Sequence, residues 1–120
     1  IMAPFAELAA ISENSSLTDT LLAMTQKPLG VSMAVDENQL LLGVFTEGDL
    51  RRSLMTGRDI HGLTLKDCMT TKPITIAPDA LAVDAVHLME TKRITALPVV
   101  RDGKVLGVVN MHHLLQARVI

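Results

Sequence analysis

The sequence contains no Trp and no Tyr, and Phe5 and Phe45 are its only aromatic residues. Proteins that bind single-stranded nucleic acids stack the bases on aromatic side chains, so this composition argues against that class. Lys and Arg number 11 against 13 Asp and Glu, which gives a net charge of −2. The cations form no basic stripe that could follow a phosphate backbone. We therefore expect no nucleic-acid partner.

Cys68 is the only cysteine. One cysteine cannot form an internal disulfide or a cysteine-based zinc site, and it fits a reducing, cytoplasmic compartment. His61 and His87 have no histidine partner at helical spacing, while His112 and His113 are adjacent and would point about 100° apart on a helix. We therefore expect no metal. Because no apolar run approaches the length of a membrane span, we also expect no membrane partner.

No pair of a nucleophile and a base is recognisable, and there is no Gly-rich phosphate-binding loop. Cys68 has no basic neighbour that would activate its thiol, and Ser and His do not occur in a triad string. We predict no catalytic residue and no required cofactor in this chain.

The sequence starts at Ile1 instead of Met, which suggests a piece excised from a longer protein.

The remaining composition, 48% apolar and 20% charged over 120 residues, is that of a globular domain with its own core. Within it, one pattern occurs twice. The copies align at 65 positions' separation and, after a one-residue deletion in a hairpin, at 64. The matched pairs are Met24 with Met89, Lys27 with Lys92, Leu29 with Ile94, Val35 with Val100, Gly43 with Gly107, Val44 with Val108, Thr46 with Asn110 and Leu50 with Leu114.

Each copy follows the order strand, helix, strand, strand, helix. We assign residues 1–57 to a first copy truncated at its start, 58–72 to a connection and 73–120 to the second copy. The opening ten residues resemble a helix or linker. Predicted strands are 31–35, 40–45, 74–76, 96–100 and 105–109; predicted helices start after Ser16, Thr46, Asp79 and Asn110. Such a unit cannot bury both faces of its sheet alone, but two copies packed sheet to sheet can.

The turn from strand to helix at residues 43–52 is the main candidate site. Free backbone N–H groups at a helix N-terminus favour an anionic group, and Asp49 can accept from sugar hydroxyls. Thr46-x-x-Asp49 is also a capping box, which forms with or without a ligand. Both interpretations stay open at this point. In either case the pseudo-twofold arrangement predicts that the two strand-to-helix turns face a shared groove.

Residues 43–49, Gly-Val-Phe-Thr-Glu-Gly-Asp, resemble the Gly-h-h-Thr/Ser-x-x-Asp/Asn motif of CBS domains, where h is apolar. Residues 107–113 form the second copy of the motif, in which Asn110 and His113 depart from the pattern. Residues 97–99, Leu-Pro-Val, and the lead-in at 66–70, Lys-Asp-Cys-Met-Thr, also resemble the family, and Ile1-Met2 resembles the end of an equivalent lead-in. The chain is therefore similar to a tandem CBS pair, or Bateman module.

This resemblance implies an α/β (α+β) fold of two β-α-β-β-α motifs, packed sheet to sheet with pseudo-twofold symmetry. Strings at 45–52, 93–95 and 111–115 further resemble the C-terminal CBS pair of bacterial D-arabinose 5-phosphate isomerases of the KdsD/KpsF/GutQ group. In that group the pair follows a sugar-isomerase (SIS) domain, which performs the chemistry. The implied function is ligand sensing for an isomerase of Kdo and lipopolysaccharide biosynthesis, with a homodimer or tetramer formed through CBS pairs.

The resemblance also implies a nucleotide or nucleotide-sugar ligand such as CMP-Kdo, CMP or an adenine nucleotide. Candidate binding residues are Thr46, Asp49, Arg51, Thr75, Ile76, Pro98, Asn110, His112 and His113. Asp49 would hold a ribose and Thr46 a phosphate. His113 cannot hold a ribose diol as a carboxylate does, so the second site is the weaker candidate. The alternative is a structural or oligomerisation module that binds nothing.

Overall fold

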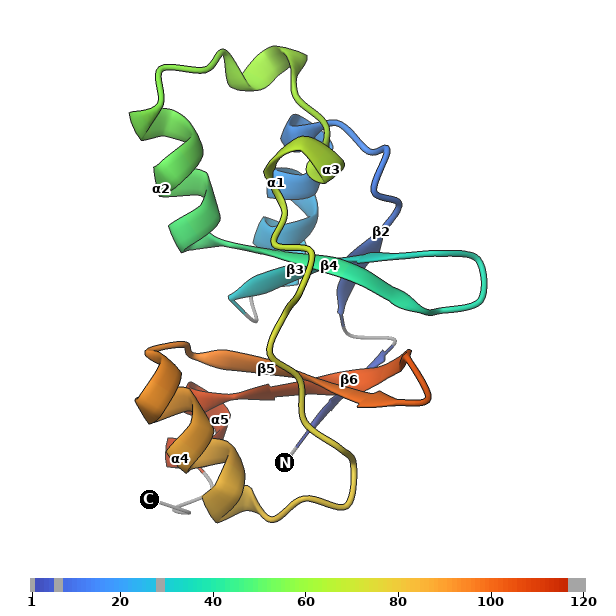
Figure 1. Ribbon diagram of the computed structural model, residues 1–120, viewed down its shortest axis with the longest axis vertical. Helices are drawn as coiled ribbons and strands as arrows, with labels where there is room; N and C mark the ends of the chain where they lie inside the picture. The colour runs from blue at the N-terminus through green and yellow to red at the C-terminus, as the bar shows by residue number, and fades with distance from the viewer. Residues whose placement is uncertain (1, 6–7, 28–29, 117–120) are drawn as a thin grey trace.

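The computed structural model describes residues 2–5, 8–27 and 30–116. Two three-stranded sheets face each other, and each carries its helices on the outer side (Figure 1). The elements in chain order are β1 (Ala3–Pro4), β2 (Ala9–Ile11), α1 (Leu17–Gln26), β3 (Val31–Val35), β4 (Leu41–Thr46), α2 (Glu47–Met55), the 3₁₀ helix η2 (Ile60–Gly62), α3 (Leu65–Cys68), α4 (Ala82–Lys92), β5 (Ala96–Arg101), β6 (Lys104–Asn110) and α5 (Met111–Gln116). The predicted fold class is confirmed.

The first sheet has the order β2-β3-β4 and the second the order β1-β6-β5. In both sheets the central hairpin is antiparallel. The predicted strand at 74–76 contributes one bridge, in which the Ile76 N–H donates to the Pro98 carbonyl at 3.0 Å and the Val100 N–H donates to the Ile76 carbonyl at 2.9 Å. The predicted turn at Asp102 and Gly103 is confirmed, since both have positive φ.

The first strand of the chain belongs to the sheet of the second copy. Ala3 pairs with Val108, whereas Thr70, in the lead-in to the second copy, pairs with Val44 of the first. Because Val44 and Val108 are matched residues of the repeat, the two lead-in segments take equivalent places on opposite sheets. The expectation of a helix or linker at the start is wrong for Ala3, where a strand of two residues forms. The pseudo-twofold symmetry thus includes an exchange of lead-in segments.

Apolar side chains fill the space between the sheets and the space under each helical layer. The buried residues between the sheets are Leu8, Val31, Met33, Val44, Val105 and Val108. Under α1 and α3 they are Leu17, Ala34, Phe45 and Leu65, and under α4 and α5 they are Ala85, Val86, Met89, Leu97 and Leu114. Each sheet is therefore buried on both faces, as the repeat predicts.

Capping predictions succeed in the first copy and fail once in the second. The Ser16 hydroxyl accepts from the Asp19 N–H at 3.1 Å, as expected for the start of α1. Asp79 does not cap α4. That helix begins after Leu81 without a side-chain cap, because Asp79 lies in a turn closed by the bond from the Ala80 N–H to the Ala77 carbonyl.

Candidate functional site

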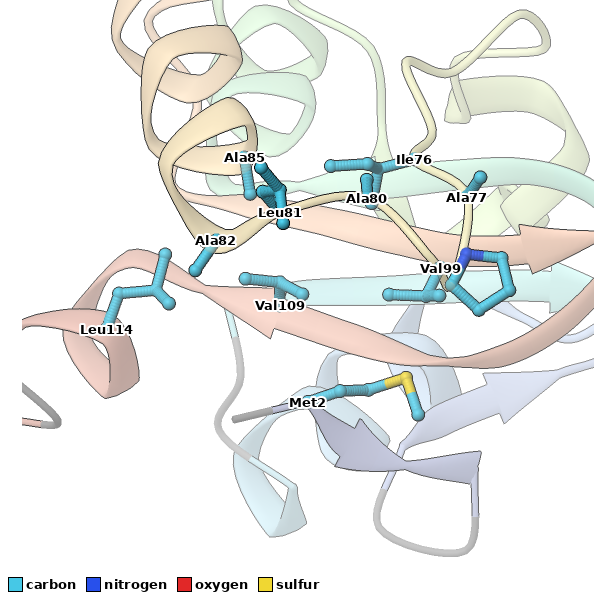
Figure 2. A pocket seen from close by; sticks show the side chains of 11 residues that line it. Met2, Ile76, Ala77, Ala80, Leu81, Ala82, Ala85, Val99, Val109 and Leu114 are labelled. Carbon is cyan, nitrogen blue, oxygen red and sulfur yellow. The ribbon is translucent and has the colours of Figure 1, made fainter. Parts of the chain in front are cut away.

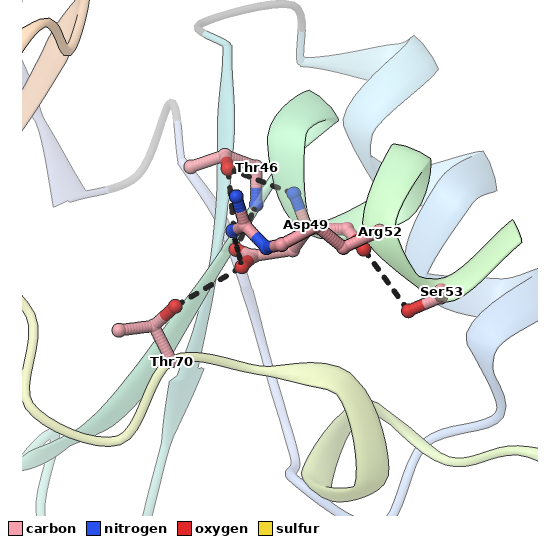
Figure 3. Close-up of polar contacts among 5 residues, drawn as sticks. All are labelled: Thr46, Asp49, Arg52, Ser53 and Thr70. Carbon is pink, nitrogen blue, oxygen red and sulfur yellow. Dashed lines mark hydrogen bonds and ion pairs between the residues drawn. The ribbon is translucent and has the colours of Figure 1, made fainter. Parts of the chain in front are cut away.

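The first-copy motif forms a complete capping box at the start of α2. The Asp49 N–H donates to the Thr46 hydroxyl oxygen at 3.3 Å, and the Thr46 N–H donates to Asp49 Oδ2 at 2.9 Å (Figure 3). The Thr46 hydroxyl lies a further 3.2 Å from the same Oδ2. The structural interpretation of Thr46-x-x-Asp49 is therefore confirmed.

The Asp49 carboxylate also joins the two copies. Its Oδ1 accepts from the Thr70 hydroxyl at 3.1 Å and pairs with the Arg52 guanidinium (Figure 3). Asp49 is only 5% exposed. Its side chain thus links α2 to the lead-in of the second copy. Sequence reasoning did not foresee either partner, although the i, i+3 spacing of Asp49 and Arg52 was a usable signal.

Both carboxylate oxygens of Asp49 are occupied by groups of the protein itself. A sugar hydroxyl could reach this carboxylate only by replacing one of those partners. Arg52 is the easier one to displace, because its side chain is 69% exposed and an exposed ion pair contributes little stability. The neighbouring Arg51 is exposed on α2.

Gly43 is required because the lead-in to the second copy, at Met69 and Thr70, passes directly beside β4. A Cβ atom at this position would lie 2.7 Å from Met69 Sδ and 2.8 Å from the Thr70 carbonyl oxygen. The lead-in reaches β4 closely enough for two backbone bonds, from the Val44 N–H to the Thr70 carbonyl at 3.0 Å and from the Thr70 N–H to the Val44 carbonyl at 2.7 Å. The motif glycine therefore makes room for the lead-in segment.

A cavity of about 460 Å³ lies between the copies. The first turns of α2 and α5 both border it, which is the shared groove predicted from the repeat. Its lining residues are Leu21, Met24, Thr25, Gly30, Glu47, Leu50, Asn110 and His112. It brings together Asn110 and His112 of the predicted residues. Glu47 places a carboxylate on the α2 side.

The second copy lacks the residue types that make the cluster around Asp49. The matched position is His113, whose side chain lies outside the described part of the chain, and Gln116 matches Arg52. The strand pairing puts Ala3 where the first copy has Thr70. Asn110 takes the role of Thr46, and its side-chain oxygen accepts from the His112 N–H at 2.8 Å. The cap is therefore kept, while the carboxylate, the cation and the hydroxyl are all replaced.

The remaining predicted residues lie elsewhere. Thr75 is exposed, and Pro98 is buried in β5 with its carbonyl bonded to the Ile76 N–H. Ile76 lines a separate apolar cavity in the second copy. The residues predicted to form one site thus border two cavities and one polar cluster.

Two exposed carboxylates in the connection, Asp59 and Asp67, have lowered pKa values. The Thr64 N–H, 2.8 Å from Asp67 Oδ2, lowers the pKa of Asp67, and the His61 N–H does the same for the pKa of Asp59. Both hydrogen bonds favour the charged form.

No group of three His, Cys, Asp or Glu able to hold a metal ion occurs in the described ranges. Among the helices of those ranges, none is long and apolar enough to cross a membrane.

The model of the CBS domain matches residues 1–56 and 65–120, which together are nearly the whole chain. The chain belongs to the CBS domain family. The two matches fall on the two copies of the repeat, so the predicted CBS pair is confirmed.

Curated proteins with high sequence identity to this chain are arabinose 5-phosphate isomerases. The chain is 42% identical over 120 residues to arabinose 5-phosphate isomerase KdsD of Yersinia pestis, covering all of this chain and 37% of that protein. For KdsD of Escherichia coli K12 the identity is 40% over 114 residues, covering 95% and 35%. This CBS pair therefore spans little more than a third of the length of these relatives. The crystal structure of CBSX2 in complex with AMP matches with a TM-score of 0.83 at 26% identity, covering 98% of this chain and 92% of that chain.

Proposed function

We propose that this CBS pair is the ligand-sensing regulatory region of a cytoplasmic D-arabinose 5-phosphate isomerase. In that enzyme a preceding SIS domain interconverts D-arabinose 5-phosphate and D-ribulose 5-phosphate for Kdo and lipopolysaccharide synthesis. The identity of 40–42% to KdsD proteins supports the assignment, as does their greater length. The pair itself supplies no step of that chemistry. Its role is to bind a nucleotide or nucleotide-sugar and to bias the attached domain.

The observation that carries this proposal is the cavity between the copies. Because α2 of one copy and α5 of the other border it, a molecule bound there contacts both. Its affinity then depends on how the copies sit, and a ligand shifts a conformational equilibrium only by such differential affinity. The complex of the relative CBSX2 with AMP supports a nucleotide as the class of ligand.

In this proposal Asn110 and His112 contact the ligand from the second copy and Glu47 and Leu50 from the first, because these residues line the cavity. Thr46 and Asp49 lie at the same start of α2 and contact a ligand that extends past Glu47. Thr75, Ile76 and Pro98 do not line this cavity, so it does not place them beside a base. Asp49 takes a ribose only when the Arg52 guanidinium moves away from its carboxylate. CMP-Kdo is the specific candidate, because sensing a later product of the pathway would give feedback control.

Thermal unfolding against AMP, ADP, ATP, CMP and CMP-Kdo tests the proposal. A ligand that binds only the folded state raises the melting temperature, and at a hundredfold excess over Kd it adds about 2.7 kcal/mol. We expect a selective rise with a cytidine compound. Asn110→Ala should reduce this rise, and Glu37→Ala, in an exposed turn of the first copy, should leave it unchanged. Arg52→Ala should increase affinity if Asp49 contacts the ribose. A rise with adenine nucleotides alone would contradict feedback by the Kdo pathway.

A structural module that binds no ligand is the second candidate, and two observations favour it. Every oxygen of the Asp49 carboxylate already has a partner within the chain. The outer helices also expose apolar side chains, among them Leu54 and Met55, which is 79% exposed. Exposed apolar surface of this kind is typical of protein–protein contacts.

For this second candidate we expect no thermal shift with any compound of the panel at millimolar concentration. Met55→Lys should convert a dimer or tetramer to monomers in sedimentation experiments, whereas Lys66→Ala, on the connection, should not. A monomer at all concentrations together with a ligand-induced shift would exclude it.

A further inference from the structure

The tips of the two β-hairpins are bonded to each other across the two copies. The Leu41 N–H donates to the Gly103 carbonyl at 2.9 Å. The Val105 N–H donates to the Gln39 carbonyl at 3.0 Å, and the Gln39 side-chain amide donates to the Val105 carbonyl at 2.6 Å. The tips also approach closely, since a Cβ atom on Gly103 would lie 3.1 Å from Leu40 Cδ2. The copies are therefore joined backbone to backbone at the turns of their hairpins.

The bonds between the tips lie on the pseudo-twofold axis of the repeat. Residues 39–41 match residues 103–105 at the 64-position separation of the second half of each copy. Leu40 therefore bridges to its own match, Lys104, and the symmetry exchanges the two backbone bonds that flank this bridge. Because the axis passes between matched residues, it passes through the bridge. Equal rotations of the two copies about this point preserve their symmetry.

The proposed ligand cavity lies at the opposite end of the same hairpins. Gly30 directly precedes β3, Glu47 directly follows β4 and Asn110 ends β6, and all three residues line the cavity. In Figure 1 both hairpin turns lie at the right, while β4 enters α2 at the left. The six residues of β4 span about 20 Å, so a rotation of about 5° at the tips moves the cavity end by about 2 Å.

The tips are the direct backbone connection between the bodies of the two copies. Among the described residues, the only backbone hydrogen bonds that link residues 8–57 to residues 73–116 are the two at the tips. The lead-in segments also connect the copies, but the one at Thr70 continues into its own copy through residues 71–75, which form no helix and contribute no strand. Such an irregular link bends more easily than paired backbones do.

We propose that the bonded hairpin tips are the pivot about which the two copies rotate when the ligand cavity opens and closes. The inference rests on the proposed function in one respect, namely that a ligand enters this cavity. A ligand that contacts both α2 and α5 favours the rotation at which both contacts form, so it shifts the equilibrium between open and closed states. The other cavity, of about 280 Å³, is lined by Met2 and by residues of the second copy alone (Figure 2), so the same rotation leaves its shape unchanged.

Distances between spin labels test the pivot in the protein without ligand. One pair of labels, on Glu37 and Arg101, spans the two tips. A second pair, on the matched residues Leu22 and His87, spans α1 and α4. All four positions are exposed, and Cys68→Ser removes the native thiol. We expect a narrow distance distribution for the tip pair and a broader one for the helix pair. Distributions of equal width would overturn the proposal.

A disulfide between the tips gives a second test that carries its own control. Leu40 and Lys104 oppose each other as a pair without direct hydrogen bonds, where Cα atoms lie about 4.5 Å apart, a separation that a disulfide can bridge. Leu40→Cys with Lys104→Cys, on the Cys68→Ser background, is measured oxidised and then reduced. Because a lock at the pivot affects the open and closed states equally, the two affinities for CMP-Kdo should agree within about threefold. A larger loss on oxidation, restored by reduction, would overturn the proposal.

These outcomes distinguish a failure of the pivot from a failure of the proposed function. If no compound of the ligand panel raises the melting temperature, the proposed function fails, and the distance distributions without ligand still decide the pivot. If CMP-Kdo binds but the tip disulfide weakens its binding, the pivot fails and ligand sensing stands.

Discussion

Replacing Asp49 by Ala should lower the free energy of unfolding by about 2–4 kcal/mol. The substitution leaves the partly buried Thr46 N–H without its acceptor, which costs about 1–3 kcal/mol. It also removes the bond from the Thr70 hydroxyl, worth about 0.5–1.5 kcal/mol, because Thr70 is exposed and water can replace the lost acceptor. The Arg52 ion pair adds little, because that side chain is largely exposed.

Urea unfolding of Asp49→Ala beside Asp67→Ala measures the effect. Asp67 forms the same box with Thr64, with bonds of 2.8 and 3.0 Å, but it is exposed. Because water can replace this acceptor, its loss should cost only about 1 kcal/mol. Equal losses in the two variants would mean that the contact between Asp49 and Thr70 does not stabilise the pair of copies.

Gly43→Ala should destabilise the protein by about 2–3 kcal/mol. The new methyl group would lie within 3.0 Å of both the Met69 sulfur and the Thr70 carbonyl. Met69 can change rotamer, but the Thr70 backbone is fixed by its two bonds to Val44. Overpacking against such a backbone costs about 1–3 kcal/mol, and here bonds between the copies are strained as well.

Gly62→Ala is the control for this prediction, because a Cβ atom there has no neighbour within 4 Å and the φ angle is not positive. Its effect should stay within about 0.5 kcal/mol. A Gly43→Ala protein as stable as Gly62→Ala would show that the lead-in segment can move away from β4 at no cost. The midpoint and the slope of urea unfolding distinguish a loss of stability from a change in compactness.

Features encoded by neighbouring residues were predictable from the sequence. The Thr46 box, the Ser16 cap and the hairpin at Asp102 depend on contacts within four residues, and each forms as predicted. The repeat added the sheet-to-sheet packing, because two matched units must bury equivalent faces. The prediction that Asp79 caps α4 was wrong, because the residues before α4 form a local turn that includes Asp79.

Features that depend on the exchange of lead-in segments were not predictable. Ala3 and Pro4 are too few to show the alternation of a strand, and nothing local ties them to β6. The Thr70 contact with Asp49 depends on the same crossing, so the cluster could not be completed from the motif alone. For the same reason, the residues predicted to form one site lie in different places. The spacing of the motif predicts where each helix starts, but it does not predict which cavity that helix borders.

The pairing of β1 with β6 also has a kinetic consequence. Contacts between residues far apart in sequence slow folding, because the chain must close a long loop before they form. During synthesis, β1 emerges first but must wait for β6, near the other end of the chain. Until then its edge is open to pairing with β6 of a neighbouring nascent chain, which is the geometry of a domain-swapped dimer. The short length of β1, and the proline within it, limit that hazard.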